Sequence, residues 1–146
     1  MATTLVIGYG NSLRSDDGIG VRIAEIVATW QLPQVRSRFI HQLTPELAAE
    51  IAEVDVVIFV DAGWTKELDA IELRQLKPLN ISEFRTHFGD PATILTLTHA
   101  LYGKCPQAWW LIVPGVNFQF GDRFSGVAET GISQALTQIR KLITHC

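Results

Sequence analysis

The sequence has few cysteines and no long apolar segment, so it offers little for disulfides, a structural metal site or a membrane anchor. Its two cysteines, Cys105 beside a proline and Cys146 at the last position, make a poor disulfide framework and lack metal-binding pair spacing. They suit a reducing compartment. No apolar stretch approaches the ~20 residues of a membrane-spanning helix. Because the first residues also lack the basic start of a signal peptide, we expect a cytoplasmic protein without membrane association.

Basic residues are too few and too scattered for a nucleic-acid-binding surface. The 146 residues include 12 Lys and Arg against 15 Asp and Glu, a net charge of −3. Residues 1–73 carry 5 basic and 11 acidic side chains, and residues 74–146 carry 7 and 4. Nucleic acid is therefore not expected as a partner. With 47% hydrophobic and 18% charged residues the chain is not disordered, and its length predicts one domain over residues 1–146.

Several catalytic signatures are missing. The sequence has no GK[ST] phosphate loop, no GxSxG elbow and no HExxH pair. The segment GYGNSL begins like a dinucleotide-binding fingerprint, but Leu13 stands where the third glycine belongs. His41 and Gln42, rather than an acid, end the second predicted strand. The sequence therefore gives little support to nucleotide binding or to serine-hydrolase chemistry.

Strand-like and helix-like segments alternate along the chain. Strands are predicted over residues 3–8, 35–42, 55–61, 70–76 and 108–113, and helices over residues 19–30, 44–53, 91–102 and 126–143. Residues 55–61 are apolar on both faces, as in the middle of a sheet, whereas residues 70–76 alternate as an edge strand does. Thr44 is predicted to cap the second helix and Gly103 to end the third. This order predicts a three-layer α/β/α sandwich, with a mainly parallel five-stranded sheet flanked by four helices.

Reactive side chains fall where such a fold collects ligands, at the carboxyl edge of its strands. The glycine-rich loop after the first strand carries Asp16 and Asp17, the third strand ends in Asp61, and His87 precedes the helix over 91–102. If the last strand is parallel, that helix runs the opposite way and His87 lies at the same edge. The lengths agree, because about 13 helical and 6 strand residues each span ~20 Å. Two carboxylates and an imidazole would form a three-ligand site for a divalent metal with open positions.

Other interpretations stay open for these residues. Either acid of the adjacent pair is suited to cap the following helix, and Asp61 is suited to bind loop amides at the end of a buried strand. His41 ends the second strand and is the reserve metal ligand. Surface or packing roles suit His99 and His145 better.

The segments GYGNSLRSDDGIGVRIAE, VIFVDA, HFGDPATILTLTHALYG and AWWLIVPG resemble, in this order, the [NiFe] hydrogenase maturation endopeptidases. The resemblance covers nearly the whole chain. With HQLTPELA included, the chain is most similar to members that process the bidirectional NAD-linked hydrogenase of cyanobacteria. The resemblance implies a cytoplasmic endopeptidase that removes a short C-terminal extension from the large-subunit precursor after nickel insertion. We expect the protein to be a monomer.

The resemblance also implies residue roles. The family's metal-contacting residues fall on Asp17, Asp61 and His87, although some members have glutamate at the position of Asp17. The metal would be nickel carried by the substrate, with zinc or cadmium able to occupy the site in vitro. Asp17 and Asp61 would polarise the attacking water. Asp16 is a candidate catalytic partner of these acids, and Asn11 is a candidate to orient the loop or to donate to an oxyanion.

Two other functions remain open. Because no independent nucleophile is visible, the chain would also suit a nickel-dependent chaperone that binds the precursor without cutting it. It would also suit a metal-dependent hydrolase of another substrate. We expect Gly8, Gly10, Gly18 and Gly20 to allow tight turns and close approach of a protein tail rather than to take part in chemistry.

Overall fold

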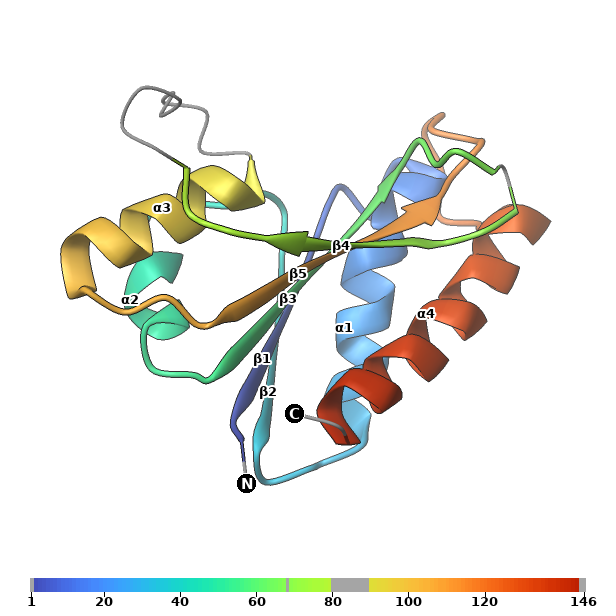
Figure 1. Cartoon of the computed structure of the whole chain (residues 1–146). Helices are drawn as coiled ribbons and strands as arrows, with labels where there is room; N and C mark the ends of the chain where they lie inside the picture. The colour runs from blue at the N-terminus through green and yellow to red at the C-terminus, as the bar shows by residue number, and fades with distance from the viewer. Residues whose placement is uncertain (1, 68, 80–89, 145–146) are drawn as a thin grey trace.

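The computed structural model describes residues 2–67, 69–79 and 90–144 and forms three layers (Figure 1). Its elements are β1 (Thr4–Tyr9), the 3₁₀ helix η1 (Ser15–Gly18), α1 (Ile19–Thr29), β2 (Val35–Ile40), α2 (Leu47–Ile51), β3 (Val56–Gly63), β4 (Glu72–Leu76), α3 (Pro91–Tyr102), β5 (Gln107–Pro114) and α4 (Gly126–Thr144). One five-stranded sheet has the order β2-β1-β3-β5-β4, with β4 antiparallel to β5 and the other pairs parallel. Helices α1 and α4 cover one face, and α2 and α3 cover the other. The predicted fold class is confirmed.

The two apolar cores follow from the alternation of side chains along the central strands. In β1, Val6 packs with α1 and α4, whereas Leu5 and Ile7 pack with α2 and α3. In β3, Ile58 and Phe59 divide between the two faces in the same way. A strand buried on both faces belongs in the interior of the sheet, and β3 lies there. The edge position predicted for the 70–76 segment is confirmed by β4.

The second helix is shorter than predicted. It begins at Leu47, and the carbonyl of Thr44 accepts the Leu47 amide in a turn that precedes it. The predicted N-cap role of Thr44 is wrong, because Glu46 occupies that position with helical backbone angles and no side-chain cap bond. The third helix agrees with the prediction, since it ends at Gly103 in the left-handed conformation with φ 66°.

Glycines bring α1 and its preceding loop unusually close to the sheet. A Cβ on Gly8 would lie 1.9 Å from the carbonyl oxygen of Gly20, and one on Gly20 would lie 2.4 Å from that of Val60. Gly10, with φ 144°, would place a Cβ 2.0 Å from the carbonyl oxygen of Asp17. Any side chain there would push η1 away from the strand ends. The close approach confirmed here is between segments of this chain, and the approach of a substrate tail stays a prediction.

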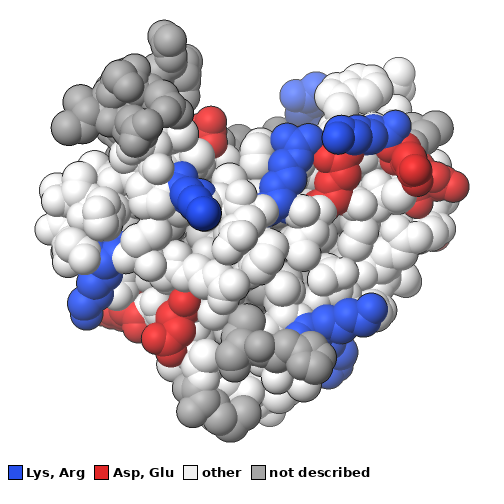
Figure 2. All heavy atoms as spheres, in the orientation of Figure 1, with Lys and Arg blue, Asp and Glu red and all other residues white. Residues whose placement is uncertain are grey.

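Charge is dispersed over the surface that Figure 2 shows. Basic side chains are separated by neutral surface, and the densest group of them lies beside acidic side chains. On β4 and just before it, Glu72 binds the Arg74 guanidinium at 2.8 Å and accepts the Lys66 amide. Within the described ranges, no helix is both long and apolar enough to cross a membrane.

Candidate functional site

The loop after β1 folds Asp17 back over the end of the sheet. One Asp17 carboxylate oxygen accepts the backbone N–H of Asn11 at 2.8 Å, and the Asp17 amide donates to the carbonyl of Arg14 at 3.1 Å. Gly18 is the N-cap of α1 and no side chain caps that helix. The capping interpretation of the acid pair is therefore wrong, and the Asp17 carboxylate is held at the carboxyl edge by its own loop.

Strand β3 places Asp61 at the same edge. Burial, and after it the negative charge of Asp17, raise the pKa of Asp61 from 3.8 to about 7. The backbone N–H of Ala62 and the Tyr9 hydroxyl lower it by smaller amounts. The two carboxylates that the sequence singles out thus lie close enough to repel each other.

Asp16, next in sequence to Asp17, is completely buried and accepts hydrogen bonds from a different set of residues. Its Oδ2 accepts the amides of Val116 at 2.8 Å and Asn117 at 3.0 Å and the Ser125 hydroxyl at 2.7 Å. Its Oδ1 accepts the Ser125 amide at 2.9 Å. Burial would raise the pKa of Asp16, but these hydrogen bonds outweigh it and hold the pKa below 3.8. The geometry gives Asp16 a structural role, and its catalytic role stays a prediction.

The bonds of Asp16 belong to a larger contact between residues 11–17 and 116–125, which we call the loop clasp. Its further hydrogen bonds join Ser15 N to Gly121 O at 2.8 Å, Ser15 Oγ to Gln119 O at 2.8 Å, Gly121 N to Leu13 O at 2.8 Å and Arg14 Nε to Phe118 O at 3.2 Å. The clasp joins segments about 100 residues apart in sequence. It forms one wall of the edge where Asp17 lies, and it carries the exposed side chains of Leu13, Val116 and Phe120.

Asn11 turns the loop toward the site. Its side-chain oxygen accepts the Leu13 amide at 2.9 Å, which closes a local turn, while its own backbone N–H holds Asp17. This agrees with the expectation that Asn11 orients the loop. Donation by Asn11 to an oxyanion stays a prediction.

Sequence reasoning missed two buried polar groups beside Asp61. Tyr9, the last residue of β1, is 7% exposed, yet its hydroxyl has no hydrogen-bond partner of regular geometry among the described residues. The same holds for the indole N–H of Trp110 in β5. Burial and then the charge of Asp61 raise the pKa of Tyr9 above its ordinary value of 10.0. Strand alternation is the signal that would have found them, because Tyr9, Asp61 and Trp110 all fall on the α2–α3 face.

The predicted histidine ligand, His87, lies outside the described residues, and its role stays a prediction. The argument that placed it is supported by its neighbours. Strand β5 is parallel to β3, and Asp90, the N-cap of α3, acts electrostatically on Tyr9 at the end of β1. The helix therefore begins at the carboxyl edge, as expected. The reserve ligand, His41, also lies there, since its carbonyl accepts the amide of Gly10 at 3.1 Å.

The two acids fit part of a cation site. In residues 2–67, 69–79 and 90–144 there is no group of three His, Cys, Asp or Glu side chains that would hold a metal ion. Asp17 and Asp61 offer carboxylate oxygens, and a cation between them would relieve the repulsion that raises the pKa of Asp61. A complete site therefore needs at least one further ligand, either from residues outside those ranges or from a bound partner.

Comparison with solved structures identifies the fold. No protein-family profile and no curated protein sequence matches the chain. The [NiFe] hydrogenase maturation protease HycI from Thermococcus kodakarensis aligns with a TM-score of 0.77 at 20% identity, over 98% of this chain and 93% of that one. The hydrogenase maturating endopeptidase HybD from E. coli gives 0.75 at 20% identity, over the same shares. The hydrogenase 2 maturation peptidase from a Thaumarchaeota archaeon gives 0.73 at 18% identity, over 97% and 98%. The chain has the fold of the [NiFe] hydrogenase maturation proteases.

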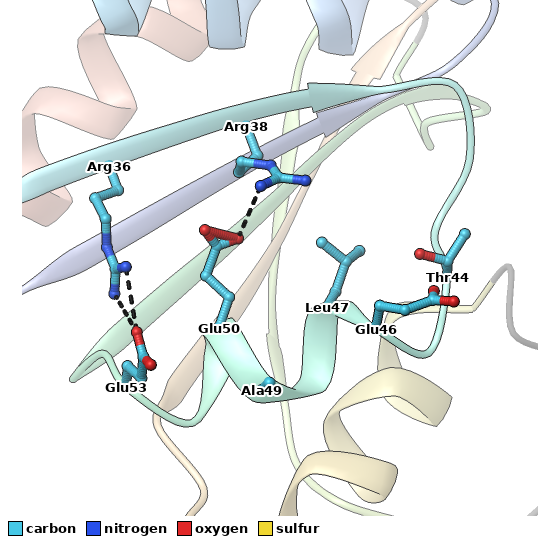
Figure 3. A pocket seen from close by; sticks show the side chains of 8 residues that line it. All are labelled: Arg36, Arg38, Thr44, Glu46, Leu47, Ala49, Glu50 and Glu53. Carbon is cyan, nitrogen blue, oxygen red and sulfur yellow. Dashed lines mark hydrogen bonds and ion pairs between the residues drawn. The ribbon is translucent and has the colours of Figure 1, made fainter.

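On this maturation-protease fold, a separate hollow of about 410 Å³ lies between β2 and α2 (Figure 3). Its lining contains neither Asp17 nor Asp61. Both arginines there are paired with acids, Arg36 with Glu53 at 3.3 Å and Arg38 with Glu50 at 3.7 Å. Because these pairs occupy both cations of the hollow, the carboxyl edge remains the better candidate for chemistry.

Proposed function

We propose that this protein is an endopeptidase that removes the C-terminal extension from the large-subunit precursor of a [NiFe] hydrogenase after nickel has been inserted. One observation carries the proposal. Asp17, in the loop after β1, and Asp61, in strand β3, converge at one edge of a fold shared over nearly the whole chain with hydrogenase maturation proteases.

Nickel bound in the precursor is, in this proposal, part of the substrate. Asp17, Asp61 and His87 contact it, so a precursor without nickel is not positioned for cleavage. The charge balance supports this assignment, because two carboxylates that repel each other gain most from a cation delivered between them. Zinc or cadmium would substitute for nickel in vitro, since both accept carboxylate and imidazole ligands.

The reaction is hydrolysis of one peptide bond. A water molecule polarised by the cation and the two carboxylates attacks the scissile carbonyl carbon. The carbon–nitrogen bond then breaks, the new carboxyl group keeps the water oxygen, and the leaving amine takes a proton. Asn11 and the loop clasp hold Asp17 in place throughout.

The surface around the acids supports a protein as the substrate. Leu13, Val116 and Phe120 are exposed on the loop clasp, and Trp64 is exposed directly after β3. Large apolar side chains gathered around a polar site are typical of contacts with another protein. We further propose that the protein acts as a monomer in the cytoplasm, and that the precursor of a bidirectional NAD-linked hydrogenase is the first substrate to test.

The test compares nickel-loaded and nickel-free precursor by mass spectrometry after incubation with the purified protein. We expect the loaded precursor to lose a C-terminal peptide and the nickel-free form to stay intact. Binding to the loaded precursor without loss of mass would favour the chaperone alternative. Equal cleavage of both forms would contradict recognition of nickel.

Histidine variants test the third ligand. His87→Ala should abolish processing, while His41→Ala, at the same edge with an exposed side chain, should process normally. Normal processing by His87→Ala would transfer the ligand role to His41.

A further inference from the structure

The most unusual groups that the proposed mechanism leaves unused are the two buried donors beside Asp61. The Tyr9 hydroxyl and the Trp110 indole N–H are shielded from solvent and have no hydrogen-bond partner among the described residues. Leaving a buried donor unpaired destabilises the folded state. Phenylalanine at position 9 would fill almost the same space without this cost.

Strand register places these donors on the two strands that neighbour β3. Gly8 pairs with Val60, so Tyr9 and Asp61, each one residue further on, lie at the same level of β1 and β3. On the other side, β5 pairs Trp110 with Phe59, two residues before Asp61. All three side chains point to the α2–α3 face. Tyr9 is therefore level with Asp61 on β1, and Trp110 lies two residues before that level on β5, where it interacts with Tyr9.

Two carboxylates, those of Asp61 and Asp90, act electrostatically on the Tyr9 hydroxyl and are the candidate acceptors for it. Oδ1 of Asp90 already accepts the Ala92 amide at 2.9 Å, as the N-cap of α3. Asp61 acts on Tyr9 more strongly than Asp90 does. The Tyr9 hydroxyl thus has a carboxylate within electrostatic reach but not yet in hydrogen-bond geometry.

We infer that Tyr9 is a positioning residue for Asp61. Its O–H group, supported by the Trp110 N–H, donates to one oxygen of the ionised Asp61 carboxylate and turns the other toward Asp17 and the cation. Tyr9 touches neither substrate nor cation itself. The inference rests on the proposed function, because it assigns Tyr9 to a carboxylate that contacts the nickel of the precursor.

The variant Tyr9→Phe isolates the hydroxyl, and the chain contains its own control. Tyr102, the second of the two tyrosines, is exposed at the far end of α3. We expect Tyr9→Phe to bind Zn²⁺ about 10-fold more weakly in calorimetry, the usual effect of removing a partner of a metal ligand. Its kcat/KM for nickel-loaded precursor should fall by a similar factor. Its melting temperature should stay the same or rise, because an unpaired buried donor is removed. Tyr102→Phe should match the wild type in all three measurements.

The outcomes separate the two proposals. A Tyr9→Phe protein with wild-type affinity for Zn²⁺ overturns the positioning role, and so does one whose losses are explained by a lower melting temperature. Wild-type protein that binds Zn²⁺ but does not cut the precursor overturns the proposed function, and Tyr9 is then judged by affinity alone. Wild-type protein that binds no Zn²⁺ overturns the positioning role, whereas cleavage of the loaded precursor would still uphold the proteolytic function.

Discussion

Asp16 and Asp61 lie at the same end of the molecule, but their surroundings have opposite electrostatic effects. Asp16 is completely buried and accepts four hydrogen bonds from the 116–125 side of the loop clasp. These bonds hold its pKa below the ordinary value. Asp61 is partly buried beside a like charge, and its pKa rises to about 7. One acid is stabilised by the fold, and the other is destabilised by it.

The difference suits Asp16 to a structural role and Asp61 to a role in binding. Fully bonded buried carboxylates are structural, and removing them leaves several donors unpaired. A carboxylate with a raised pKa at a ligand-binding edge is a functional candidate with a physical cause. The predictions below test this contrast.

The largest expected effect is on processing by the repelling acids. Asp17→Asn and Asp61→Asn should each lower kcat/KM for nickel-loaded precursor by about 1,000-fold or more, because each removes a charged cation ligand. Their free energies of unfolding should stay the same or rise, since each substitution relieves the repulsion. The control is Asp55→Asn, where β3 enters the sheet at its opposite end, and it should process normally. Loss of both stability and processing would assign Asp17 and Asp61 to the fold.

Asp16→Ala should act on stability instead. It leaves the amides of Val116, Asn117 and Ser125 without their acceptor, and we expect a loss of about 3 kcal/mol in urea denaturation. A change below about 0.5 kcal/mol would show that the clasp contributes little. Lost processing in a fully folded Asp16→Ala protein would instead support the catalytic role first predicted for Asp16.

The pH dependence of stability should have opposite signs at the two acids. For Asp61 the folded protein holds its proton more tightly than the unfolded chain does. The contribution of Asp61 to the free energy of unfolding is therefore fully present below about pH 4 and is lost as the pH rises toward 7. For Asp16 the folded pKa is lowered, so its contribution is present above the ordinary pKa of 3.8 and is lost in acid. Urea denaturation of the metal-free wild type, Asp61→Asn and Asp16→Asn from pH 2 to 8 measures both. Between pH 4 and 8 the wild type should lose about 4 kcal/mol relative to Asp61→Asn. If the difference in unfolding free energy between the wild type and Asp61→Asn did not change with pH, the raised pKa of Asp61 would be contradicted.

The smallest effect is expected at the partner of Asp16. The Ser125 hydroxyl donates to Asp16 and accepts the Ala128 amide at 3.1 Å, in the first turn of α4. Ser125→Ala should cost about 1 kcal/mol. Ser133→Ala, exposed on the same helix, should cost less than about 0.5 kcal/mol. If both variants lost the same unfolding free energy, the Ser125 hydroxyl would contribute nothing to the stability of the loop clasp.

The layers and the edge of the sheet follow from patterns that the sequence displays locally. The apolar segment at 55–61 predicted an interior strand, and β3 is one. Asp17 and Asp61 were predicted to share an edge because the carboxyl ends of parallel strands meet there, and their interaction agrees with this. The parallel direction of β5 was the condition for placing the start of α3 at that edge, and it is met.

The roles within the acid pair depended on contacts between distant segments. Nothing near Asp16 in sequence indicates that its partners lie about 100 residues away, because the clasp forms only when the β5–α4 loop folds back. In its local sequence, Tyr9 is indistinguishable from the other apolar residues of a buried strand. Its relation to Asp61 depends on the register between β1 and β3, which the residues around Tyr9 alone do not specify. The predicted cap at Thr44 was wrong because a preceding turn leads directly into α2.

The measurement that tests the account most directly is the melting temperature of the isolated protein with and without Ni²⁺. If Asp17 and Asp61 form a site that lacks only its cation, saturating Ni²⁺ should raise the wild-type melting temperature by about 3–8 °C. Asp17→Asn and Asp61→Asn should show no such rise, while Asp55→Asn should show it in full. Equal shifts in all four proteins, or no shift in the wild type, would contradict the account.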